Sequence, residues 1–382
     1  MTFDSRLFRR WIHRASQAAA GLAALAPLSA AYAEWELNMP RGVTLISREA
    51  YDQHMLMLWW CVGIGVVVFG AMFYSMFRHR RAAGHAAANF HHNTFAEIVW
   101  TVIPVVILVL MAIPATRALI VMEDTSEADM TLKVTGHQWK WRYEYLEDDV
   151  DFFSSLAPES REAIYSDPYA TDNYLLEVDN EVVLPVGRKV RILLTADDVI
   201  HAWWVPALGM KKDAIPGFIN ELWTRIDEPG IYRGQCAELC GKDHGFMPIV
   251  VRAVPDEEYV AWVDDRHAAQ ELVAQEALRD WTVEELMVRG REIYITACAA
   301  CHQQNGQGLP PSFPAITGSE IATGPLDAHL DRVMNGKPGT AMAAFAQQLG
   351  DSDLAAVITY QRNALGNAVG DSVQPSAVRA AR

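Results

Sequence analysis

The sequence predicts three structural regions in one chain: a pair of membrane-spanning helices, an all-β domain and a small all-α domain. Two apolar runs in the first third of the chain are long enough to cross a bilayer. Short runs rich in β-branched residues, separated by Gly, Pro and Asp, fill the middle. Near the C-terminus, helical periodicity surrounds a C-x-x-C-H segment. A length of 382 residues agrees with two or three domains.

The composition is that of a folded chain. Hydrophobic residues make up 51% and charged residues 21%, which excludes a disordered or collagen-like protein. The 47 acidic side chains outnumber the 32 Lys and Arg and give a formal net charge of −15. This acidic balance argues against a nucleic-acid partner and permits a basic protein partner. Five cysteines are too few for a disulfide scaffold.

The first 33 residues have the pattern of a secretory signal peptide. Four arginines precede a short run of small apolar residues over 18–30, and Ala31-Tyr32-Ala33 matches an A-x-A cleavage site. The alternative is an N-terminal membrane anchor, which this apolar run is too short to provide.

Residues 34–125 are predicted to form a transmembrane hairpin with spans at 55–77 and 98–120. The first span carries no charge, and the second is uncharged until Arg117. Two buried core helices are the alternative, but uncharged runs of this length rarely serve that role. Three arginines lie in the loop between the spans. The positive-inside rule places this loop in the cytoplasm and everything after about Met122 on the periplasmic side.

Two groups of ionisable residues in this hairpin have open interpretations. Four histidines share the loop between the spans. Because neither a carboxylate nor a cysteine accompanies them, we expect a solvated loop rather than a metal cluster. Glu97 stands at the start of the second span. It is either a functional ionisable group or an interfacial carboxylate that faces water.

Residues 126–262 are predicted to form an antiparallel β sandwich or barrel. Runs at 130–134, 189–194 and 248–251 are β-rich and are separated by turn residues. Residues 139–145 alternate aromatic and polar types, so one strand face would carry four aromatic rings. Trp141, Tyr143 and Tyr145 are expected to be ordinary core residues of this strand.

A first metal-binding pattern spans residues 236–247. Two thiols, an imidazole and a thioether fall within twelve residues, and His201 lies upstream. Soft sulfur ligands select copper, and imidazole suits copper as well. Two thiolates on one loop can bridge two copper ions, which then share one electron. A disulfide between Cys236 and Cys240 and a zinc site are the alternatives, although zinc would not require Met247 in register.

A second pattern lies in residues 283–366, which are predicted to be all-α. Cys298, Cys301 and His302 form the C-x-x-C-H signature of c-type haem attachment. Both thiols would add to the haem vinyl groups, and His302 would be an axial ligand. The sixth ligand is expected to be Met342, which would raise the potential, with Met334 as the alternative.

The remaining segments are assigned as connections. Residues 263–282 are charged and Ala-rich and are predicted to be a helical linker. Residues 367–382 are expected to be a disordered tail.

Taken together, these segments resemble the cytochrome c oxidase subunit 2 family, in the bacterial form that is fused to a cytochrome c domain. The resemblance is carried by residues 136–139, 198–201, 212–217, 236–247 and 298–302. It implies a cupredoxin-like Greek-key sandwich with a binuclear copper centre, CuA, and an all-α class I cytochrome c domain. The implied copper ligands are the side chains of His201, Cys236, Cys240, His244 and Met247, together with the backbone carbonyl of Glu238.

The resemblance also implies roles and partners. Trp139 would be the residue through which electrons enter CuA, and Glu97 would lie at the mouth of a proton channel in subunit 1. The Glu238 carboxylate would reach a Mg²⁺ site shared with subunit 1. The expected complex contains subunits 1 and 3 in a bacterial inner membrane. It takes electrons from a soluble cytochrome c or an upstream respiratory complex, and it reduces O₂ to water while translocating protons.

Three other functions share parts of this sequence pattern. A quinol oxidase subunit 2 would share the hairpin and sandwich but lack the two cysteines of the copper loop. A nitric-oxide-reducing relative with a CuA subunit would have the same pattern, and the sequence of subunit 1 would be needed to distinguish the two. A copper chaperone would have C-x3-C on a thioredoxin-like fold and no haem motif.

Overall fold

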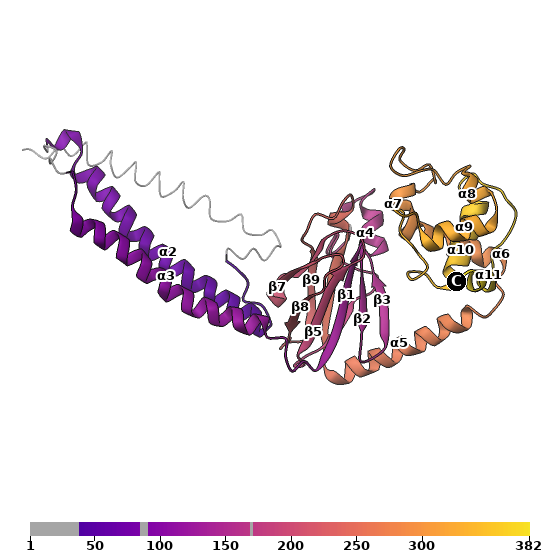
Figure 1. Cartoon of the computed structure of the whole chain (residues 1–382), viewed down its shortest axis with the longest axis horizontal. Helices are drawn as coiled ribbons and strands as arrows, with labels where there is room; N and C mark the ends of the chain where they lie inside the picture. The colour runs from indigo at the N-terminus through magenta and orange to yellow at the C-terminus, as the bar shows by residue number, and fades with distance from the viewer. Residues whose placement is uncertain (1–37, 85–90, 169–170) are drawn as a thin grey trace, which may run out of the picture. The chain divides into compact units, whose positions relative to one another are not determined.

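A computed structural model describes residues 38–84, 91–168 and 171–382. The chain divides into two units, residues 1–40 and residues 41–382. The predicted signal peptide lies outside the described residues. All elements below belong to the second unit, and Figure 1 shows their order along the chain.

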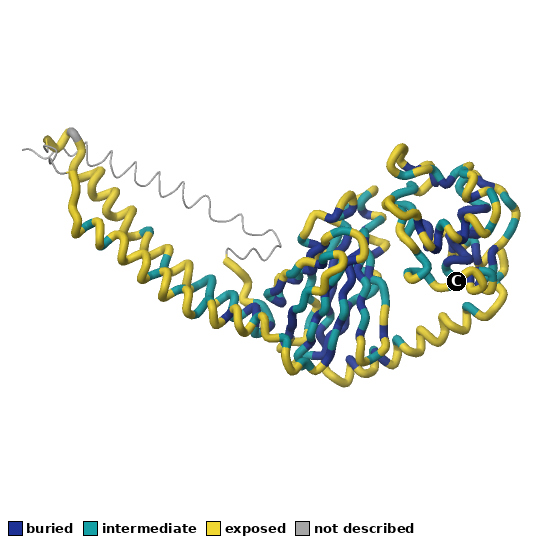
Figure 2. The backbone as a smooth tube through the Cα atoms, in the orientation of Figure 1, coloured by how far each residue is buried: buried dark blue, intermediate teal, exposed yellow. Residues whose placement is uncertain are grey.

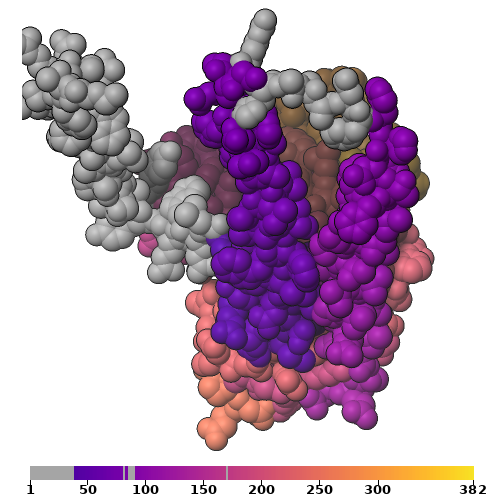
Figure 3. All heavy atoms as spheres, turned by 90° about the vertical axis from the view of Figure 1, so that its left-hand side faces the viewer, coloured from indigo at the N-terminus to yellow at the C-terminus, as the bar shows by residue number. Residues whose placement is uncertain are grey.

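Two long helices form the predicted hairpin, α2 (Leu45–Arg78) and α3 (Thr94–Glu123). Thr44 begins α2 with a capping box that Ser47 completes, and Asn93 caps α3. Among the described residues, these two helices are long and apolar enough to cross a membrane. Their apolar side chains are exposed rather than packed in a protein core, which argues against the core-helix alternative (Figures 2 and 3). The short η1 (Arg81–Ala83) follows α2.

The β domain is a sandwich of two five-stranded sheets. The strand orders are β3-β2-β1-β5-β8 and β4-β10-β9-β6-β7. The strands are β1 (Met130–His137), β2 (Lys140–Tyr145), β3 (Val150–Ser154), β4 (Val182–Pro185), β5 (Val190–Ala196), β6 (His201–Val205), β7 (Met210–Ala214), β8 (Asn220–Thr224), β9 (Gly230–Cys236) and β10 (Pro248–Val254). Short helices α4 (Pro158–Ala163), η3 (Pro206–Leu208) and η4 (His244–Phe246) lie in the connections.

The all-β sandwich is confirmed, but two strand pairs depart from the predicted antiparallel arrangement. β1 pairs with β5 in parallel, and β4 pairs with β10 in parallel. Parallel neighbours need a long crossover connection, and these partners are far apart in the sequence. Local turn signals reveal hairpins but carry no information about such distant pairings, so the sequence pattern could not show them.

The aromatic strand β2 supplies the centre of the core, as predicted. Trp141, Tyr143 and Tyr145 are all buried on one face. Trp203 donates an indole hydrogen bond to the Tyr143 hydroxyl at 3.2 Å, which satisfies both buried polar groups. Burying each such ring removes ~150–250 Å² of surface from water, so this strand face supplies much of the apolar area that the sandwich buries.

One continuous helix, α5 (Asp256–Glu276), leads out of the sandwich. Its first turns pack Tyr259, Trp262 and Val263 against the β-domain core. The helix therefore crosses the predicted boundary between residues 262 and 263, and the predicted linker is helical over most of its length.

The C-terminal domain is all-α, as predicted. Its elements are α6 (Val283–Ile293), the π-helical turn η5 (Tyr294–Cys298), α7 (Ala299–His302), α8 (Glu320–Thr323), α9 (Leu326–Asn335), α10 (Asp351–Asn363) and α11 (Pro375–Ala381). Helices α6 and α10 cross closely at Gly290, where an added Cβ would lie 2.1 Å from the Ala356 carbonyl oxygen. Only glycine permits this approach, and Tyr294 and Tyr360 pair beside it with centroids 5.6 Å apart.

The expectation of a disordered tail is wrong. Residues 375–381 form α11, and Val373 and Val378 are buried in the domain core. The Gln374 side chain accepts a hydrogen bond from the Trp281 backbone N–H and donates one to its carbonyl. The polar, Ala-rich composition hid this docking because the tail offers few large apolar side chains.

Candidate functional site

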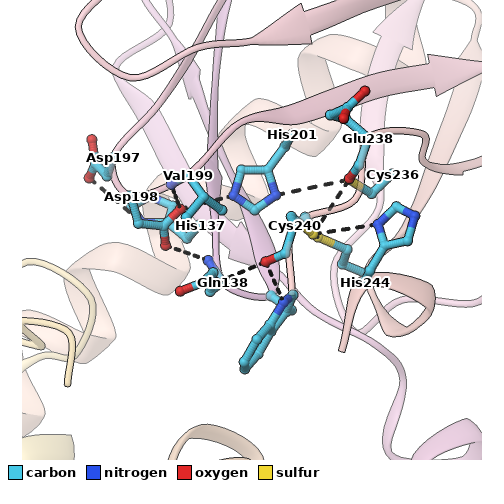
Figure 4. Close-up of polar contacts among 12 residues, drawn as sticks. His137, Gln138, Asp197, Asp198, Val199, His201, Cys236, Glu238, Cys240 and His244 are labelled. Atoms are coloured by element: carbon cyan, nitrogen blue, oxygen red, sulfur yellow. Dashed lines mark hydrogen bonds and ion pairs between the residues drawn. The ribbon is translucent and has the colours of Figure 1, made fainter. Parts of the chain in front are cut away.

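The first site forms where two strands and one loop of the sandwich meet. His201 begins β6, and Cys236 ends β9, the strand beside it. The β9–β10 loop brings Cys240, His244 and Met247 over the same point. His201, Cys236, Cys240 and Met247 are 0–3% exposed. Figure 4 shows the two imidazoles on either side of the two sulfurs.

All six residues of the predicted ligand set come together. The two Sγ atoms are 3.8 Å apart. His201 Nδ1 lies 3.9 Å from Cys236 Sγ, and His244 Nδ1 lies 3.5 Å from Cys240 Sγ. Met247 Sδ is 3.5 Å from Cys240 Sγ, and the Glu238 carbonyl oxygen is 3.4 Å from Cys236 Sγ. The candidate ligand atoms of His201, Cys236 and Cys240 all lie within 4.8 Å of one another.

The chemistry of this donor set fits a soft metal. Both cysteines are free thiols, so the structure contains no disulfide between them. Their separation of 3.8 Å is shorter than two metal–sulfur bonds of ~2.3 Å, so one metal ion can contact both sulfurs. The hydrogen bond between the thiols lowers the pKa of Cys236, and the same bond raises the pKa of Cys240, which therefore keeps its proton. A bound cation would be needed to hold both sulfurs as thiolates.

Asp198 holds the His201 ring in place, a role that the sequence motif alone did not reveal. Its Oδ1 lies 2.9 Å from His201 Nε2, so the carboxylate accepts the Nε2–H and leaves Nδ1 free to face the sulfurs. The carboxylate also accepts backbone N–H bonds from Gln138 and Val199. Burial raises the pKa of Asp198, but these hydrogen bonds outweigh it and the net direction is downward.

Gly136 makes room for the same ring. A Cβ at this position would lie 2.7 Å from His201 Cδ2. A larger residue at this position of β1 would therefore displace the imidazole.

Trp139 contacts the copper loop directly. Its indole Nε1 donates to the Cys240 carbonyl oxygen at 3.2 Å, and Gln138 Nε2 donates to the same oxygen at 2.8 Å. The ring is half-buried and packs against the β-domain core. It thus extends from the partly exposed surface to the backbone of a predicted ligand.

The two carboxylates with predicted roles lie at exposed positions. The Glu238 side chain is exposed, and its carboxylate points away from the sulfurs (Figure 4). Glu97 is exposed in the first turn of α3. Among the described residues, the group that could hold a metal ion includes neither carboxylate. The roles predicted for the Glu238 carboxylate and for Glu97 therefore stay predictions.

The second site lies on α7 and the turn before it. Cys298 and Cys301 are free and half-buried. His302 Nδ1 lies 2.8 Å from the Pro314 carbonyl oxygen, to which it donates its proton. This bond fixes the ring orientation and leaves Nε2 as the available ligand atom. The C-x-x-C-H residues therefore fit covalent haem attachment.

The two methionines differ in their surroundings. Met334 is buried in the core of the α domain beside Leu330 and Val333. Met342 lies half-buried in the loop between α9 and α10, where its carbonyl accepts the Lys337 N–H at 3.0 Å. Core packing accounts for Met334, and Met342 stays the preferred prediction for the sixth ligand.

Comparisons with known families cover most of the chain. Residues 130–254 match the family described as "Cytochrome C oxidase subunit II, periplasmic domain", and residues 32–118 match its transmembrane domain. Residues 285–360 match the family described as "Cytochrome C oxidase, cbb3-type, subunit III". The first two families imply copper and membrane anchoring with a periplasmic domain, and the third implies haem c.

Named relatives agree with these matches. "Probable cytochrome c oxidase subunit 2" of Rickettsia bellii is 40% identical over 234 residues, which cover 61% of this chain and 85% of the relative. "Cytochrome c oxidase subunit 2" of Cereibacter sphaeroides is 37% identical, covering 54% of this chain and 74% of the relative. A solved structure of the periplasmic domain of subunit II of cytochrome oxidase from Bradyrhizobium japonicum is 43% identical. That match covers 38% of this chain and 98% of the other, with a TM-score of 0.34. The chain therefore belongs to the cytochrome c oxidase subunit 2 family and carries a C-terminal domain of the cytochrome c type.

Proposed function

We propose that this chain is the electron-accepting subunit of a cytochrome c oxidase: electrons arrive at a covalently bound haem c, pass to a binuclear CuA centre, and leave for the haem-copper site of subunit 1. The observation that carries the proposal is the buried cluster of two free thiols 3.8 Å apart, flanked by two imidazoles and a thioether. When bound, the copper pair and the haem supply one-electron redox chemistry.

The chain's own residues hold the copper pair. Cys236 and Cys240 would hold the copper ions through their sulfurs, and His201 and His244 would bind through the Nδ1 atoms that face those sulfurs. Met247 and the Glu238 carbonyl would complete the set. Because strands β6 and β9 and the Asp198 hydrogen bond fix these groups, they move little when the charge of the site changes. A small rearrangement favours fast electron transfer at low driving force.

Trp139 provides the path by which electrons enter the copper site. Its conjugated ring reaches from a half-exposed position to the Cys240 carbonyl. This contact supports an electronic route through one ring and one backbone group to the residue that carries the Cys240 sulfur.

Cys298 and Cys301 would attach the haem, and His302, through Nε2, and Met342 would hold its iron. The Pro314 carbonyl accepts the hydrogen bond from His302 Nδ1–H, which makes the imidazole a better ligand through Nε2. A thioether as the sixth ligand raises the haem potential.

The membrane hairpin ties this subunit to its partners. The apolar, exposed faces of α2 and α3 need lipid or the helices of subunits 1 and 3 around them. In this complex, Glu97 would serve a proton channel of subunit 1, and the Glu238 carboxylate would share a Mg²⁺ ion with that subunit. We place the complex in a bacterial inner membrane, where O₂ reduction is coupled to proton translocation and the donor is a soluble cytochrome c or an upstream respiratory complex.

Metal analysis and electron paramagnetic resonance of the purified full-length chain test the proposal. We expect two copper ions per covalent haem and a mixed-valence two-copper signal. Cys240→Ser should abolish that signal and keep the c-type haem absorbance. Cys61→Ser, in α2 and outside the site, is the matched control and should change neither. An unchanged two-copper signal in Cys240→Ser would refute the bridging role.

A further inference from the structure

A chain of buried polar side chains leads to the sulfur of Cys298. His329 on α9 and Gln361 on α10 are each 3% exposed. His329 Nε2 lies 2.9 Å from Gln361 Oε1, and Gln361 Nε2 lies 3.7 Å from Cys298 Sγ. Three separate elements therefore meet at one of the two sulfurs that the haem motif provides.

Covalent attachment decides the direction of these hydrogen bonds. A cysteine that has formed a thioether carries no S–H, so its sulfur can only accept. The Gln361 amide must then present its N–H₂ to the sulfur and its oxygen to His329. This arrangement requires the proton of His329 on Nε2 and leaves a lone pair on Nδ1.

The surroundings keep His329 neutral. Burial lowers the pKa of His329 to about 4. Its Nδ1 has no hydrogen-bond partner among the described residues. The nearby Asp371 carboxylate is already paired with Arg362, and the Arg362 charge further opposes protonation. His329 is therefore a fixed neutral donor to Gln361.

We propose that His329 is a positioning residue for haem c: through Gln361, it holds an N–H donor against the thioether sulfur of Cys298. The inference rests on the proposed haem attachment and adds residues that the C-x-x-C-H motif does not contain. A donor at this sulfur withdraws electron density from the attached ring and stabilises the reduced haem. Hydrogen bonding of this kind, outside the direct ligands, is one of the ways in which proteins set haem potentials.

Redox titration of haem c in the purified oxidase complex tests this role. His329→Leu and Gln361→Leu should each keep the covalent haem and lower its midpoint potential by a similar amount. The double variant should shift no further than either single variant, because His329 acts on the Cys298 sulfur only through the Gln361 N–H donor. His329→Gln keeps an N–H donor and should retain the wild-type potential.

Leu330→Ala is the matched control. Leu330 is buried on the same helix as His329, so its truncation destabilises the domain and leaves the His329–Gln361–Cys298 contacts in place. The haem c potential of this variant should not shift. The inference would be overturned if His329→Leu and Gln361→Leu both left the haem potential unchanged. Additive shifts in the double variant would overturn it as well. A wild-type protein that lacks c-type absorbance would instead overturn the proposed function.

Discussion

The β domain and the C-terminal α domain prepare their redox sites in different ways. In the β domain, His201 and Cys236 lie on neighbouring strands, and one loop carries the other side-chain ligands to them. The protein fold alone brings the whole donor set together. In the α domain, His302 is oriented by Pro314, while both cysteines and Met342 lie only half-buried on a turn and a loop.

This contrast has a physical consequence. Sheet register and a buried aromatic core hold the candidate copper ligands in place without metal. In the α domain, covalent bonds to the proposed haem would replace what the backbone does not fix. We therefore expect the α domain to depend on its cofactor for stability more strongly than the β domain depends on copper.

Removing the attachment sulfurs should have the largest effect. Cys298→Ser with Cys301→Ser should abolish covalent haem and lower the melting temperature of the α domain, while the two-copper signal persists. Haem absorbance, calorimetry and paramagnetic resonance of the same sample measure the three quantities. The counterpart experiment removes copper with a chelator and measures the melting temperature of the β domain. A larger loss of stability in the β domain without copper than in the α domain without haem would contradict the expectation.

Asp198→Asn should weaken copper binding by about 10- to 100-fold, the typical cost of losing a hydrogen-bond partner of a metal-binding histidine. The amide lacks the charge that stabilises the Nε2–H tautomer of His201. Competition with a copper chelator measures the change. Asp197→Asn is the control, because that carboxylate is more exposed and faces His137 instead. Equal effects at both positions would mean that general negative charge, and not the His201 contact, matters.

The sixth haem ligand can be assigned by exchange. Met342→His should lower the haem c potential enough to change the ratio of reduced to oxidised haem at least tenfold, or about 59 mV for one electron, because imidazole replaces a thioether. Met334→Leu preserves core volume and should leave the potential unchanged. The reverse outcome would transfer the assignment to Met334.

The smallest predicted effect is a pH dependence of the α domain. The pKa of His329 is lowered to about 4 in the folded state, against ~6.5 when unfolded. Between these values the unfolded state binds more protons, so stability falls as pH falls. Linkage gives a loss of about 1 kcal/mol from pH 6.5 to 5.5. Calorimetry should show this fall in the wild type and a flatter profile in His329→Leu, and identical profiles would contradict it.

Most residues of the two candidate sites could be picked out from the sequence because they are close together in the chain. Residues 236–247 are close in the chain, and so are residues 298–302, so spacing alone indicates two thiols at one copper site and two thiols on one haem. The same holds for the membrane hairpin, since length and the absence of charge are properties of a segment and not of its neighbours.

What only the tertiary structure decided depends on contacts between distant segments. The parallel strand pairs, the docking of α11, the space that Gly136 leaves for His201 and the buried path from His329 to Cys298 all join residues that no local pattern connects. Local spacing encodes which atoms can bind a cofactor, whereas the positions of supporting groups follow from packing, in which any sequence separation can become a contact.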